Sequence, residues 1–137
     1  MPVSAEDVEV KTVKSDQLSK AFVGLVGEMV VQEKERTGEL PEGATRPEFI
    51  ISRIQAVERN HPGIFAVTKE QEARFAAGNY DEEENRKAMK LRIRHFAEKE
   101  TALPTMHVFL IKKFNEDKLR GAELEFAVRL LSSDLEE

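Results

Sequence analysis

The side chains in this sequence that can bind a metal ion are three histidines and many carboxylates. Glu58 and His61 have the Glu-x-x-His spacing of di-iron helical bundles, but such a site needs two of these motifs and two further carboxylates on facing helices. The sequence contains the motif once, beside a proline. We therefore predict no metal site. We interpret His61 as a turn residue near a helix C-terminus, His107 as a residue at the edge of the core, and His95 as exposed to solvent.

Nucleophilic and cofactor chemistry have no recognisable motif in this chain. Cysteine is absent, which excludes disulfides, thiolate metal sites and cysteine nucleophiles. No serine lies in a Gly-x-Ser-x-Gly elbow, and no glycine-rich phosphate loop occurs. Gly24 and Gly27 form a pair of small residues inside an expected helix, where they let another helix approach closely. We predict no catalytic residue and no cofactor, and an acid–base enzyme built from scattered carboxylates stays an alternative.

Five basic residues between positions 86 and 94 form a cluster that suits phosphate binding. On a helix, three of them have an acidic residue four positions away, and such pairs stabilise an exposed helix by about 0.2–0.5 kcal/mol each. Aromatic residues that would stack on bases are not interleaved with them. We therefore favour a solvated helix face over a nucleic-acid contact. The candidate phosphate contacts are Arg86, Lys87, Lys90 and Arg94, and Arg92 completes the cluster.

The overall charge and hydropathy narrow the class of protein further. The net charge of −5 disfavours nucleic acid as a partner, since duplex-binding domains usually carry a basic surplus. Hydrophobic residues make up 40% of the chain, enough for a folded core in a domain of this length. The longest apolar stretch, 21–31, contains Glu28 and is shorter than the roughly 20 residues that span a bilayer. Residues 1–14 lack the apolar core of a signal peptide, so we expect a soluble, cytoplasmic protein outside the membrane.

The segment 15–37 is the clearest expected helix. Ser15 is a suitable N-cap, and Gly38 suits the position just after the C-terminus. Apolar residues repeat every three or four positions on two neighbouring stripes, and a third stripe holds Gly24, Gly27 and Val31. A helix that is apolar over most of its circumference lies either at the centre of the fold or at an interface. The predicted interaction face consists of Leu18, Phe22, Val23, Leu25, Val26, Met29 and Val30.

Capping signals indicate four of the later helices. The segments 45–48 and 68–71 are capping boxes, and each begins a predicted helix. The helix that follows the second box is expected to end at Gly78. Asp81 is predicted to begin a helix that runs to about residue 100. Asn115, which two acidic residues follow, is predicted to cap the last helix, with Gly121 inside that helix.

The segment 87–114 is ambiguous between helix and strand. Met89, Leu91 and Ile93 alternate with basic residues, which is the period of a strand. The wider window is dominated by Glu, Lys, Arg, Ala and Met, which favour helix. We predict helix, and the alternative is a β-hairpin at 87–114 in an α+β fold.

The sequence as a whole predicts an all-α fold, a compact bundle of about five or six helices with the hydrophobic first helix at its centre. We expect residues 1–14 to be a flexible lead-in, 15–133 a single helical domain and 134–137 an acidic tail. The function we expect is non-enzymatic protein–protein interaction, as an adaptor or by self-association into an oligomer. The alternatives are a nucleic-acid-associated regulator that uses the helix 86–94, and a small-molecule-binding or catalytic domain without a readable motif.

Overall fold

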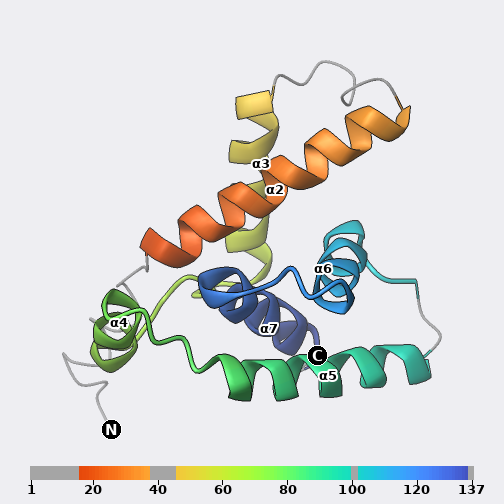
Figure 1. The fold of residues 1–137 in the computed structure, drawn as a ribbon. Helices are drawn as coiled ribbons and strands as arrows, with labels where there is room; N and C mark the ends of the chain where they lie inside the picture. The colour runs from red at the N-terminus through yellow and green to blue at the C-terminus, as the bar shows by residue number, and fades with distance from the viewer. Residues whose placement is uncertain (1–15, 38–45, 100–101, 136–137) are drawn as a thin grey trace, which may run out of the picture.

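Six helices make up most of the part of the chain that the computed structural model describes, residues 16–37, 46–99 and 102–135 (Figure 1). They confirm the expected all-α fold of five or six helices, and α-helix at both 82–99 and 105–115 excludes the hairpin alternative at 87–114. The expected lead-in 1–14 and the signals at Ser15, Gly38 and Thr45 lie outside the described residues. The helices are α2 (Asp16–Thr37), α3 (Arg46–Asn60), α4 (Lys69–Ala76), α5 (Glu82–Lys99), α6 (Thr105–Asn115) and α7 (Gly121–Leu135).

The capping box predicted before α4 is confirmed. The Gln71 N–H donates to Thr68 Oγ1 (3.0 Å), and the Thr68 N–H donates to Gln71 Oε1 (2.9 Å). At the other end of α4, Gly78 takes a left-handed φ of 78°, which glycine adopts without steric cost. The Asn79 N–H then donates to the Arg74 carbonyl (2.7 Å), which closes a Schellman motif.

The prediction that Asn115 caps the last helix is wrong. Asn115 is the last residue of α6, and Asp117 takes a left-handed φ of 59° just after it. The Lys118 N–H donates to the Lys113 carbonyl (2.9 Å), so the segment forms a helix C-terminus. The last helix begins only at Gly121, which has a φ of 57° and donates its N–H to Glu82 Oε1 (2.8 Å). Gly121 therefore lies at the start of α7 rather than inside a helix. At its other end α7 runs to Leu135, into the segment expected as an acidic tail.

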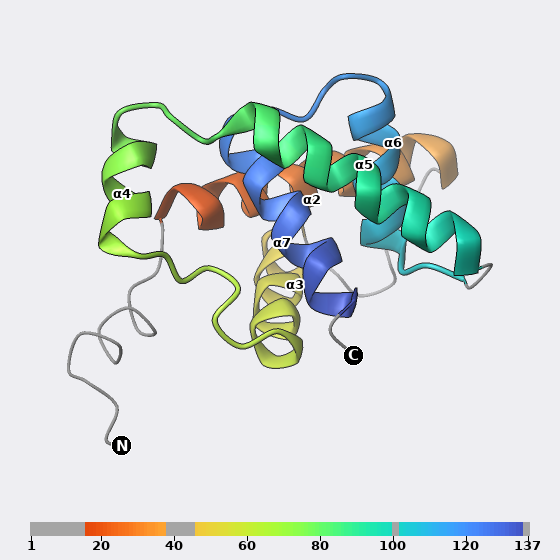
Figure 2. The same ribbon diagram turned by 90° about the horizontal axis from the view of Figure 1, so that it is seen from below.

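The core lies around α7, which packs between α2 and α5 and also contacts α6 (Figures 1 and 2). Three phenylalanines from distant parts of the chain meet at its centre, in α2, in the turn after α3 and in α7. The ring centroids of Phe22 and Phe126 are 4.7 Å apart, and the Phe65 ring lies 5.8 Å from the first and 5.6 Å from the second. All three side chains are buried. Aromatic pairs at such distances add about 0.5–1.5 kcal/mol beyond the burial of their area.

Helix α3 is less well covered than the other long helices. It packs mainly on α2 (Figure 1), and no side chain described in it is fully buried. Phe49, Ile50, Ile54 and Val57 are half-buried, and Ile51 is 55% exposed. This helix therefore leaves part of its apolar face on the surface of the chain.

We expect Phe22→Ala to lower the free energy of unfolding by about 3–5 kcal/mol, because it opens a cavity where three rings meet. The neighbouring change Val23→Ala removes a side chain that is 38% exposed and should cost less than about 0.5 kcal/mol. Urea denaturation followed by circular dichroism measures both. Equal losses in the two variants would contradict the described orientation of α2.

Candidate functional site

The structure buries most of the interaction face predicted on the first helix. Six of its seven residues are at most 8% exposed and belong to the core that this chain builds for itself. Only Val23 stays exposed. Helices α3 and α7 both pack against α2, and these six residues have almost no surface left to offer a partner. The six are Leu18, Phe22, Leu25, Val26, Met29 and Val30.

The opposite side of α2 carries the exposed stripe that includes the two glycines. Lys20, Gly24, Gly27 and Val31 are separated by four, three and four positions, so they lie along one line of the helix. A groove of about 540 Å³ runs along this line and reaches α3. We call it the α2–α3 groove; it is lined by Val23, Gly24, Gly27, Glu28, Val31, Gln32 and Ile50.

The fold itself does not require glycine at the floor of the α2–α3 groove. A Cβ atom on Gly27 would meet nothing within 4 Å, and one on Gly24 would come no closer than 4.0 Å to Glu123 Oε2. Glycine inside a helix costs about 0.8–1.0 kcal/mol relative to alanine. Its effect here is to expose helix backbone between Val23 and Val31, where another helix can approach closely.

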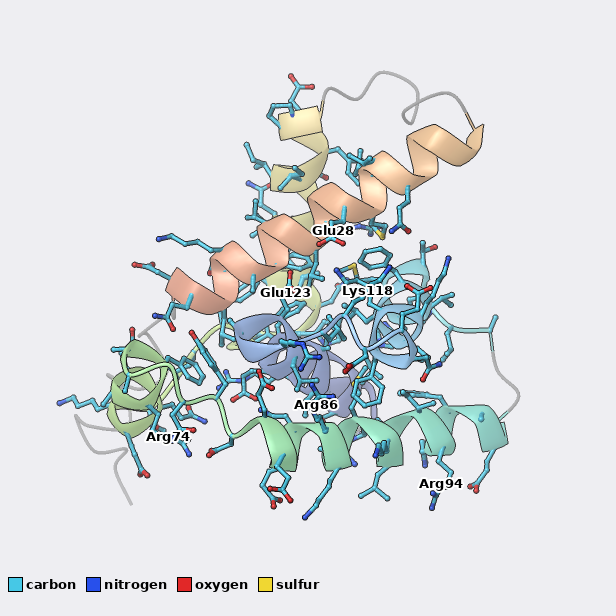
Figure 3. The ribbon with its side chains drawn as sticks, viewed as in Figure 1. Glu28, Arg74, Arg86, Arg94, Lys118 and Glu123 are labelled. Atoms are coloured by element: carbon cyan, nitrogen blue, oxygen red, sulfur yellow. The ribbon has the colours of Figure 1, made fainter. Side chains whose placement is uncertain are left out.

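A buried lysine fixes the charged edge of this groove. Lys113 on α6 is only 7% exposed, and its Nζ lies 2.6 Å from Glu28 Oε2 and 5.9 Å from the centre of the Phe109 ring. Glu123 lies close to Glu28 beneath α2 (Figure 3). Burial raises the pKa of the Glu123 carboxyl, the positive charge of Lys113 lowers it, and the negative charge of Glu28 raises it again. Lys113 thus ties α2 to α6 and holds two carboxylates near one cation.

We expect Glu123→Gln to change how stability depends on pH. The pKa of Glu123 is raised above 4.5 in the folded chain, so the folded state binds more protons than the unfolded state between 4.5 and the folded pKa. The contribution of this carboxyl to stability therefore falls as pH rises through that window, and the glutamine variant lacks that loss.

Urea denaturation between about pH 4 and pH 8 measures this difference. The free energy of unfolding of Glu123→Gln, relative to the unaltered chain, should rise with pH across the window. Glu98→Gln, at an exposed position on α5, serves as the control. A relative stability of Glu123→Gln that falls with rising pH would contradict the described burial of Glu123.

Most of the basic cluster on α5 is paired within this chain. Arg86 lies 3.0 Å from Asp117 Oδ1, and it points toward the body of the fold in Figure 3, whereas Arg94 points away from it. The hydrogen bond from Arg86, with the charge of Arg120, holds the pKa of Asp117 below its usual value. Lys87 pairs with Glu83 and Glu84 at 3.8 and 3.7 Å, and Arg92 Nε donates to Ser132 Oγ (3.1 Å). Lys87, Lys90 and Arg94 are the exposed members of the cluster.

The three histidines lie apart from the α2–α3 groove. His61, in the turn after α3, has its Nδ1 2.7 Å from Ser133 Oγ. His107 is 3% exposed and meets the Phe96 ring edge-on at 5.9 Å, so it lies deeper than the core edge where it was expected. The exposure expected for His95 is wrong, because its ring packs edge-on against Phe96 (5.8 Å) and leaves the residue half-buried. Within residues 16–37, 46–99 and 102–135, no group of three or more metal-binding side chains occurs.

No protein-family model, no curated protein and no solved structure matches this chain. Among the helices that the structure describes, none is long and apolar enough to cross a membrane. Sequence reasoning grouped Gly24, Gly27 and Val31 on one stripe but assigned the interaction to the two stripes that the fold buries.

Proposed function

We propose that this chain is a non-enzymatic assembly protein that binds a second copy of itself through the α2–α3 groove. The observation that carries this proposal is the groove floor of Gly24 and Gly27, where the fold has room for side chains and none is present. Small residues at a helix surface let two helices pack backbone to backbone. An isologous dimer uses the same patch on both copies, so one groove is sufficient.

Lys20 on the exposed stripe and Glu28 at the groove edge suit an antiparallel arrangement of two α2 helices, in which Glu28 contacts Lys113 of its own chain and faces Lys20 of the partner subunit. Consider a two-fold axis that passes between Gly24 and Gly27. With a rise of about 1.5 Å per residue, Lys20 of one copy then lies within about 5 Å along the helix axis of Glu28 of the partner subunit. The symmetry repeats this pair on the other side of the axis. Exposed ion pairs contribute about 0.2–1 kcal/mol each and mainly fix orientation.

Apolar side chains that the fold leaves partly exposed support the α2–α3 groove as the dimer surface. Val23 and Val31 on α2 line the groove and are 38% and 37% exposed. Ile50 is half-buried and lines the groove. Burying a fully exposed apolar side chain stabilises by about 1.5–3 kcal/mol, and the part that each of these still exposes gives a fraction of that. A second copy placed on the α2–α3 groove covers residues from both helices.

We expect Gly27→Gln to weaken association while it stabilises the folded chain. The new side chain enters open space in the single chain and raises helix propensity by about 0.5 kcal/mol, but it fills the space that the partner helix needs. Sedimentation equilibrium between about 10 µM and 1 mM should show the unaltered chain growing heavier than its 15.6 kDa monomer, and Gly27→Gln should stay close to that mass.

Leu91→Gln is the matched control, because it replaces an apolar side chain of α5 that is 56% exposed. It should associate as the unaltered chain does. An unaltered chain that stays monomeric at every concentration overturns the self-association proposal, and so does a Gly27→Gln variant that associates normally.

A second variant changes the charge at Lys20 and leaves the groove floor intact. Lys20→Glu places like charges together at both symmetry-related pairs and should weaken the dimer by on the order of tenfold. Lys90→Glu makes the same change at an exposed position on α5 and should leave association unchanged. Equal effects of the two variants would show that net charge, and not the antiparallel arrangement, governs association.

A further inference from the structure

A second and more enclosed pocket of about 250 Å³ lies on a different part of the chain. It is formed by α3, the turn that follows it, the start of α6 and one residue of α7. This volume is below the roughly 300–1,000 Å³ of pockets that hold drug-sized molecules. The pocket therefore suits a ligand of a few heavy atoms rather than a nucleotide or a peptide.

The lining of this pocket joins nitrogen-bearing side chains with apolar ones. Arg53, Asn60, His61 and His107 supply nitrogen groups, and Val57, Met106 and Leu130 are among the apolar residues. Among the described residues that line it, none carries a carboxylate. A site with hydrogen-bond donors and a cation on one side and apolar surface on the other suits an organic anion.

Arg53 is the residue that gives the pocket its positive charge. Its guanidinium carbon lies 5.8 Å from the centre of the Phe49 ring, a distance at which the ring face attracts the cation. Its Nε is buried and has no hydrogen-bond partner among the residues that the structure describes. The guanidinium keeps its positive charge beside the pocket, and a charged donor binds a carboxylate or phosphate more strongly than a neutral one does.

The first turn of α6 also lies in the wall of this pocket. Pro104 occupies the N-cap position and provides no side-chain cap, and Thr105, Met106 and His107 of the first turn line the pocket. The N–H groups of a first helical turn have no partner within the helix and favour an anion. The charge of Arg53 and this helix terminus thus favour the same kind of ligand.

We propose that this pocket binds a small organic anion, with its carboxylate or phosphate group at Arg53 and His61 and its apolar part against Val57 and Leu130. This site is distinct from the α2–α3 groove, because the two share no lining residue. Binding here does not depend on self-association. Gly27→Gln should therefore bind the anion as the unaltered chain does.

Isothermal titration of the full chain with hexanoate, hexyl phosphate and hexanol tests the proposal. We expect saturable binding of at least one of the two anions and at least tenfold weaker binding of hexanol, which lacks the charge. The anion that binds more tightly identifies the head group. Binding of neither anion up to about 10 mM, or binding of hexanol as tight as that of the anions, overturns the proposal.

Arg53→Met should weaken anion binding by about tenfold or more, because it keeps the length of the side chain and removes the charge. Arg59→Met is the matched control at an exposed position on the same helix, and it should bind as the unaltered chain does. If Arg53→Met does not fold, Ala56→Leu replaces it, since Ala56 lines the pocket and a larger side chain there fills it. Unchanged affinity in the folded variant overturns the proposal.

Discussion

The contact between Phe22, Phe65 and Phe126 fixes how α2 is rotated in this fold. It joins α2, the turn after α3 and α7 at one buried point. Residues on an α-helix are about 100° apart, so Val31 lies on the side opposite Phe22, and Gly24 and Gly27 flank that line. The burial of the Phe22 face therefore places both glycines on the opposite, outer face of α2, where Gly24 is exposed and Gly27 is half-buried. The proposed self-association through this outer face depends on the aromatic contact.

The buried Lys113 sets the position of Glu28 on the outer face of α2. The 2.6 Å contact from α6 fixes a carboxylate at the edge of the α2–α3 groove. The raised pKa of Glu123 shows the cost of keeping a second carboxyl partly buried nearby. In this pair only Lys113 is buried, whereas the Glu28 side chain is 46% exposed, and the cost of removing a charge from water offsets much of the attraction. The pair fixes α6 against α2 and gives the groove a charged edge on one side.

Local sequence signals predicted the elements of this fold better than they predicted its surfaces. The capping box at 68–71 was recognised because its two hydrogen bonds lie within four residues. Asn115 was misread because an asparagine before two acidic residues resembles an N-cap, whereas the left-handed Asp117 that ends α6 leaves no such mark. Which stripe of α2 is buried depends on its packing against α3 and α7, and the pocket at Arg53 and His107 joins residues more than fifty positions apart. Local periodicity therefore predicts neither the α2–α3 groove nor this pocket.

The central claim is that α2 buries one face in its own core and offers the opposite face to a second copy of the chain. Methyl NMR spectra recorded from low to high protein concentration test it directly, because exposed methyl groups occur on several helices. The account predicts concentration-dependent shifts at Val23, Val31 and Ile50, with Leu91 of α5 and Val108 of α6 unchanged. Spectra that do not depend on concentration, or shifts of equal size at Leu91 and Val108, would contradict it.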